Sequence, residues 1–103
     1  MADPLVYVYA VGDATLAGRE ELAGLVGVDG APVRALVAGG LAAAVSSVDP
    51  GRFDEEALRR GLEDLAWLEE IARAHHHVVD VLGRGQAVAP MRLATIFVDD
   101  DNV

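Results

Sequence analysis

Three consecutive histidines, His75, His76 and His77, are the residues of this chain best suited to metal chemistry. Neighbouring residues of an α-helix point about 100° apart, so three adjacent imidazoles cannot hold one ion on an intact helix. Ligand pairs on a helix stand three or four positions apart instead. We therefore predict no metal site here. His75 is expected at a helix–sheet boundary, with His76 and His77 exposed.

The acidic and hydroxyl residues show no catalytic spacing. Asp99-Asp100-Asp101-Asn102 lacks the alternating ligands and the distant glutamate of a calcium-binding EF-hand loop, which favours an exposed acidic tail over residues 99–103. Glu55-Glu56 and Glu69-Glu70 are typical of charged helix surfaces, and Ser46-Ser47 lies outside any nucleophile-elbow motif. The sequence predicts no catalytic residue, no cofactor and no enzyme activity.

Arg92 is a charged residue in unusual, apolar surroundings. It lies in an apolar stretch beside Pro90 and Met91, where a charge is costly unless it is paired. Two interpretations stay open. Arg92 forms a structural salt bridge with an acidic residue of the long helix or the hairpin described below, or it contacts a partner or a second domain.

The longest element that could position these residues spans residues 54–82. Its apolar residues recur at steps of three and four, which predicts one amphipathic helix with a face made of Leu58, Leu62, Leu65, Leu68, Ala72, Val79 and Leu82. Asp54 is a suitable N-cap, and Trp67 is expected to pack in the core or at the sheet boundary. Such a helix is about 43 Å long. A compact domain of this size is only about 34 Å wide, so we expect the helix to bend around the histidines or to project past the sheet.

The remaining segments predict strands and one short helix. Residues 5–11 (LVYVYAV) are β-branched and aromatic, which indicates a central strand. A short, poorly formed helix is expected over residues 19–25. Residues 33–38 and 41–47, joined by Gly39-Gly40, predict a hairpin. Residues 86–98 form the last strand region, which Pro90 breaks or places at an edge.

This order predicts an α+β fold, a modified ferredoxin-like sandwich with the pattern βαββαβ. Its two helices, at about 19–25 and 54–82, lie on one face of an antiparallel sheet. Because small residues suit packing against a helix, we predict that Val6, Val8 and Ala10 lie under the helices and that Tyr7 and Tyr9 lie on the opposite face. Residues 1–98 are assigned to this single domain.

Charge and composition narrow the function classes. The net charge of −9 repels phosphate backbones, so no nucleic-acid partner is expected, and the absence of cysteine excludes disulfides and thiolate sites. No apolar run is long enough to span a membrane and no basic signal-peptide region is present, so we expect a cytoplasmic protein. The hydrophobic content of 52% predicts apolar surface left for a partner.

Several stretches together resemble the GvpL/GvpF family of gas vesicle proteins. They are LAAAVS at 41–46, LEDLAWLE at 62–69 followed by Ala74-His75, and PMRLATIF at 90–97; the first strand and the 27–33 loop fit as well. The resemblance covers essentially the whole chain and implies an N-terminal domain with a modified ferredoxin-like fold, followed in full members by a coiled-coil-rich domain. This chain ends at Val103, where full members run on, and has Ala94 where the family often has glycine. We therefore expect the first domain alone, excised or from a naturally short relative.

The resemblance implies an accessory role in forming the gas vesicle, a hollow protein shell, without enzymatic activity. The implied partners are the main hydrophobic shell protein and other accessory proteins, and we expect Tyr7, Tyr9 and Arg92 to take part in this binding. The alternative is a small-molecule-binding regulatory domain of ferredoxin-like fold. An acyl-phosphate hydrolase fits poorly, because residues 12–15 offer neither the arginine nor the asparagine that this chemistry needs.

Overall fold

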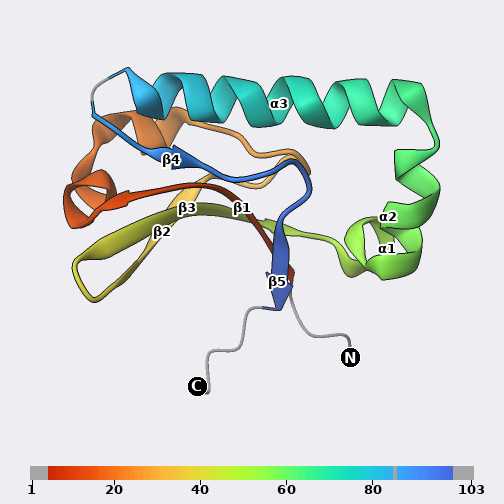
Figure 1. Cartoon of the computed structure of the whole chain (residues 1–103), viewed down its shortest axis with the longest axis horizontal. Helices are drawn as coiled ribbons and strands as arrows, with labels where there is room; N and C mark the ends of the chain where they lie inside the picture. The colour runs from red at the N-terminus through yellow and green to blue at the C-terminus, as the bar shows by residue number, and fades with distance from the viewer. Residues whose placement is uncertain (1–4, 85, 99–103) are drawn as a thin grey trace.

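The computed structural model of the chain describes residues 5–84 and 86–98 (Figure 1). In chain order its elements are strand β1 (Leu5–Asp13), the 3-10 helices η1 (Ala14–Gly18) and η2 (Glu20–Gly24), strands β2 (Arg34–Ala38) and β3 (Leu41–Val48), helices α1 (Pro50–Phe53), α2 (Glu55–Leu62) and α3 (Leu65–Gly83), and strands β4 (Ala89–Pro90) and β5 (Ile96–Val98). In this part of the chain no helix is long and apolar enough to cross a membrane.

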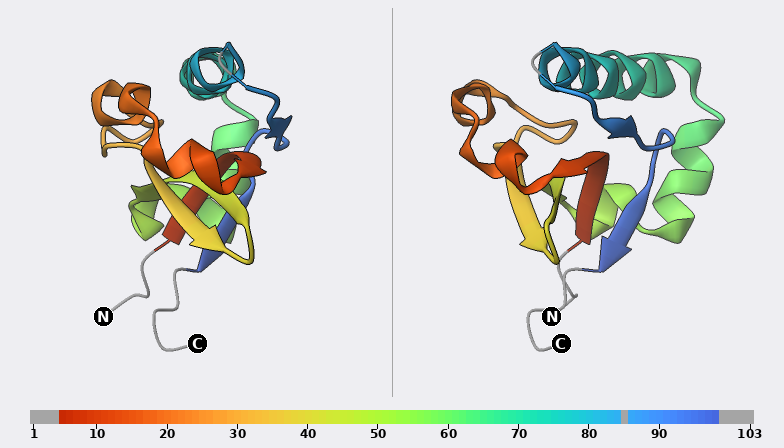
Figure 2. Two further views of the ribbon diagram at one scale, coloured as in Figure 1. Left: turned by 90° about the vertical axis from the view of Figure 1, so that its left-hand side faces the viewer. Right: turned by 60° about the vertical axis from the view of Figure 1, so that its left-hand side comes forward.

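The strands form one antiparallel sheet in the order β2-β3-β1-β4, and β5 also pairs with β1. β1 is therefore central, as predicted. Helix α3 runs along one face of the sheet, and α1 and α2 lie beyond one end of it (Figures 1 and 2). This arrangement confirms the predicted α+β class and is compatible with a ferredoxin-like sandwich.

The two breaks in strand structure that the sequence predicts are both present. Gly39 and Gly40 turn the hairpin with φ of 58° and 81°, the left-handed conformation that a type I′ turn requires at both positions. The last strand region is interrupted after Pro90, which has no N–H for a ladder. Residues 91–95, here called the 91–95 loop, connect β4 to β5.

The prediction of one helix over residues 54–82 is wrong, because α2 and α3 are separate helices. Asp64 begins α3: its carboxylate accepts the backbone N–H groups of Ala66 and Trp67 at 3.0 and 3.3 Å. Gly61 lets the Trp67 ring pack against α2, since a Cβ there would lie 2.8 Å from the ring. With 19 residues, α3 is about 28 Å long, so it needs neither a bend at the histidines nor a projecting end.

The buried stripe of α3 lies one residue before the predicted face at two positions and coincides with it at Leu82. Its buried residues are Ile71, His75, Val78 and Leu82. Ala72 and Val79, which the prediction included in the face, are only partly buried, whereas Leu82 is buried as predicted. His75 therefore occupies the middle of an otherwise apolar stripe.

Residues 14–33 complete the core. The predicted short helix at 19–25 is present as the 3-10 helix η2, and its segment buries Leu16, Leu22, Leu25, Val28 and Val33. Arg19 joins this segment to α3 by donating to the backbone carbonyls of Val81 and Leu82. A guanidinium at that position complements the negative C-terminal end of the helix, where the Val81 carbonyl also accepts the backbone N–H of Arg84.

The two faces of β1 are reversed relative to the prediction. Tyr7 and Tyr9 are fully buried in the main core, on the face that α3 covers. Val6 and Val8 form a smaller cluster with Val45 on the other face. The prediction considered only side-chain size, whereas each tyrosine hydroxyl finds polar partners inside the core. Neither ring offers surface to a partner in this structure.

Candidate functional site

A buried chain of hydrogen bonds links β1, α3 and the 91–95 loop. Tyr7 Oη lies 2.9 Å from His75 Nδ1, and His75 Nε2 lies 3.1 Å from the Met91 carbonyl oxygen. Because a carbonyl can only accept, Nε2 carries the proton, and Nδ1 accepts from the Tyr7 hydroxyl. The Tyr7 oxygen in turn accepts the backbone N–H of Ala94 at 2.9 Å. Each polar atom of this network is thus paired.

Burial keeps both side chains of this network neutral. Burial lowers the pKa of His75; the Met91 carbonyl opposes this shift and His76 adds to it. Burial also raises the pKa of Tyr7 to about 12, although the hydrogen bond from Ala94 works against the rise. At neutral pH the contact is therefore a hydrogen bond between uncharged groups, and the tautomer of His75 is fixed by its two partners.

The network holds the 91–95 loop in a strained conformation. Ala94 has a φ of 65°, a region that residues with a Cβ rarely adopt. Its N–H is bonded to Tyr7, and the Thr95 hydroxyl closes the turn by donating to the Arg92 carbonyl at 2.7 Å. The loop is therefore fixed by hydrogen bonds to the core and within itself.

Tyr9 fixes a second loop in the same way. Its hydroxyl oxygen accepts the backbone N–H of Val28 at 2.8 Å and lies 2.6 Å from Ser46 Oγ. Gly27 is required beside it, since a Cβ there would lie 2.5 Å from Tyr9 Oη. The buried Ser46 hydroxyl is thus a structural partner of Tyr9.

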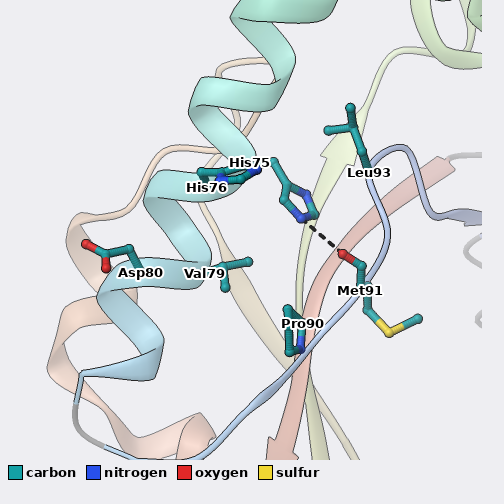
Figure 3. Close-up of a pocket in the computed structure, with 7 residues that line it drawn as sticks. All are labelled: His75, His76, Val79, Asp80, Pro90, Met91 and Leu93. Carbon is teal, nitrogen blue, oxygen red and sulfur yellow. Dashed lines mark hydrogen bonds between the residues drawn. The ribbon is translucent and has the colours of Figure 1, made fainter.

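A pocket of about 430 Å³ opens between α3 and the 91–95 loop. Its lining combines apolar and polar residues: His75, His76, Val79, Asp80, Pro90, Met91 and Leu93. Figure 3 shows the His75 ring directed from α3 toward the Met91 carbonyl across this space. The pocket therefore depends on the same network that fixes the loop.

Arg92 lies on the 91–95 loop and is exposed. Within residues 5–84 and 86–98, no acidic side chain forms an ion pair with it; the pairs formed there include Arg52–Asp29, Arg73–Glu69 and Arg84–Asp80. The predicted salt bridge to the long helix or the hairpin is therefore absent from the described part of the chain. Partner contact stays a prediction for Arg92.

The histidine cluster is arranged as the sequence predicts. His75 is buried at the boundary between α3 and the sheet, and His76 and His77 are exposed. Among the described residues, no three histidine, aspartate or glutamate side chains are grouped to hold a metal ion. The acidic tail predicted for residues 99–103 lies outside the described residues.

The fold and these contacts define a small α+β domain in which two buried tyrosines hold two loops against an antiparallel sheet. The family model described as "Gas vesicle synthesis protein GvpL/GvpF" matches residues 5–103, and the chain belongs to this family. It is 44% identical over 101 residues to Gas vesicle protein L of Streptomyces sp. (strain CB03234) and 38% identical over 97 residues to Gas vesicle protein F of the same organism.

These similarities cover most of this chain but little of its relatives. The matched regions are 98% and 94% of this chain, yet only 37% and 35% of the Gas vesicle protein L and Gas vesicle protein F sequences. The chain thus spans about a third of the length of the curated relatives it matches. No solved structure matches it significantly. Family membership gives the chain a role connected with gas vesicles.

Proposed function

We propose that this domain is a non-enzymatic assembly or minor structural component of the gas vesicle in the cytoplasm, and that it binds the main hydrophobic shell protein and other gas vesicle proteins. The family match and both curated relatives support the gas vesicle role. The observation that carries the binding proposal is the surface made by the pocket and the 91–95 loop, here called the loop–pocket surface.

The loop–pocket surface presents accessible apolar side chains beside its polar ones. Leu93 lines the pocket and is 37% exposed, and Phe97 on the following strand is 57% exposed. Met91 packs against the cluster around Val6, and Phe97 stands opposite Val6 in the ladder. Since paired residues of an antiparallel ladder share a face, apolar surface continues from the pocket to the face of the sheet that α3 does not cover.

Arg92 gives this surface a charge that can orient a partner. It stands between two apolar loop residues, Met91 and Leu93, and is exposed. An aliphatic partner that buries Leu93 and Phe97 gains from apolar contact. A carboxylate or backbone carbonyl of that partner can then accept from the guanidinium. Tyr7 supports this surface from the core as a positioning residue, and Tyr9 holds the separate loop around Val28.

Co-purification of the tagged chain with the co-expressed main shell protein tests this proposal. Leu93→Asp places a charge in the apolar surface and is expected to abolish co-purification, and Arg92→Ala is expected to weaken it. Leu65→Asp is the matched control, because Leu65 is 81% exposed at the start of α3 and lies outside the pocket lining. If the wild-type chain does not retain the shell protein, the binding proposal is wrong. If Leu93→Asp retains it fully, the loop–pocket surface is not the binding site.

The pocket favours one second candidate, a regulatory domain that binds a small molecule. Its volume of about 430 Å³ falls in the range of about 300–1,000 Å³ that is typical of ligand sites. A bound metabolite would raise the melting temperature with increasing ligand concentration, by mass action. A thermal-shift screen of metabolites against the wild type and Leu93→Asp separates the two candidates, since only a ligand in this pocket gives a shift that the variant loses.

A further inference from the structure

Strand β2 has a free edge with unused hydrogen-bonding groups. It pairs with β3 on one side and is the outermost strand of the sheet. Ala38 and Leu41 flank the two-residue turn and form a hydrogen-bonded pair, so the alternation of the ladder directs the N–H and C=O groups of Ala35 and Val37 away from β3. Among the described residues, no hydrogen bond engages these outward groups. They are a template for a further strand.

This edge lacks the features that usually prevent strand pairing. Proteins protect edge strands with lysine, proline, bulges or inward-pointing charges. The β2 sequence is RALVA, whose single charge stands at its first position. Large apolar side chains are also exposed on this hairpin: Leu36 at 42%, Val37 at 55% and Leu41 at 56%. The edge is therefore mainly apolar and is exposed over residues 36–38, whereas Arg34 and Ala35 are partly buried.

The charge distribution favours a second copy of the same chain as the partner that pairs with the β2 edge. The chain has 17 acidic residues and a net charge of −9, so most of its surface repels another copy. Residues 31–48, which include β2 and β3, contain no acidic residue. An antiparallel pair centred on Leu36 sets Ala35 against Val37 and Arg34 against Ala38. No like charges face each other, and the arrangement has the self-complementarity that a two-fold interface requires.

We propose that β2 pairs antiparallel with β2 of a second copy of this chain, so that the two sheets become one. In this register the outward groups of Ala35 bond those of Val37 in the other copy, and the two Leu36 side chains meet across the two-fold axis. Five residues per strand make a small interface, so the dimer is weak, with a dissociation constant on the order of 10 µM or above. The dimer edge is opposite to the β4–β5 side of the sheet, and so the inference does not rest on the proposed shell contact.

Sedimentation velocity across a concentration series tests the dimer. The wild-type mass is expected to rise from 10.8 kDa toward twice that value. Leu36→Lys and Leu36→Glu each place like charges directly opposite one another and should stay monomeric at every concentration. Mixing the two variants sets lysine against glutamate and should restore the dimer, which also shows that both variants are folded. Leu65→Lys is the matched control on α3 and should dimerise like the wild type.

Amide hydrogen exchange identifies the interface. The Ala35 and Val37 amides should exchange rapidly in dilute wild-type protein and slow down as the protein dimerises. A wild-type chain that remains monomeric up to its solubility limit overturns the proposal. So does a dimer in which the Ala35 and Val37 amides stay unprotected, or one that both Leu36 variants form as readily as the wild type.

Discussion

Replacing Tyr7 with phenylalanine tests the hydrogen-bond network most directly. The change removes one buried oxygen and leaves the ring, so His75 Nδ1 and the Ala94 N–H both lose their partner. An unsatisfied buried polar group costs about 1–3 kcal/mol. His75 is only 5% exposed, whereas Ala94 is partly exposed and water can replace part of its lost bond. We therefore expect the free energy of unfolding to fall by about 2 kcal/mol in denaturant titrations.

Amide exchange locates the effect. If the loss of about 2 kcal/mol falls on local opening of the 91–95 loop, the Ala94 amide exchanges about 30-fold faster. Tyr9→Phe is the matched comparison, because the Tyr9 hydroxyl accepts the backbone N–H of Val28 and not that of Ala94. It should accelerate exchange at Val28 and leave Ala94 unchanged. A loss below about 0.5 kcal/mol for Tyr7→Phe, with unchanged exchange at Ala94, would refute the assigned network.

Three further perturbations follow from the same contacts. Burial lowers the pKa of His75 below its ordinary 6.5. The free energy of unfolding should therefore keep its full value above that pH and decrease as the pH falls below it. His75→Gln should flatten this pH dependence in melts, and an unchanged slope would contradict the assigned role of His75. Gly27→Ala should lower stability by about 1–3 kcal/mol through overpacking against Tyr9, whereas Gly18→Ala, with no neighbour within 4 Å of the added Cβ, should not. Ala94→Gly relieves the φ of 65° and should raise the melting temperature, with a gain of about 0.5–1 kcal/mol; a lower melting temperature would show that the loop is unstrained.

The elements that local chemistry determines could be predicted from the sequence. The β-branched and aromatic run of β1 gives the central strand, two adjacent glycines give the hairpin, and Pro90 breaks the last strand. Each of these signals acts through the backbone of the residues that carry it. Their order along the chain was enough to predict the α+β class and the antiparallel sheet.

The predictions that failed concern features that depend on tertiary contacts. Leu62 and Leu65 continue the helical period and hid the break between α2 and α3, but they are 49% and 81% exposed. The sequence signal for that break is the N-cap Asp64 three residues after Gly61. An apolar count also omits His75, so the predicted stripe of α3 included Ala72 and Val79 in place of Ile71 and Val78. A histidine is compatible with the core only because two hydrogen-bond partners meet it there.

The reversed faces of β1 also depend on tertiary contacts. Their polar contacts link the core to the proposed loop–pocket surface. By size alone, valines fit under a helix better than tyrosines do. A buried tyrosine hydroxyl needs partners, and His75 and the Ala94 amide supply them for Tyr7. Backbone hydrogen bonds from Met91 to the Tyr9 carbonyl and from Val8 to the Thr95 carbonyl tie the two ends of the 91–95 loop to β1, and the Tyr7 hydroxyl holds Ala94 between them. The polar groups of the core therefore decide where Arg92 and Leu93 stand, which explains why the loop–pocket surface could not be located from apolar periodicity.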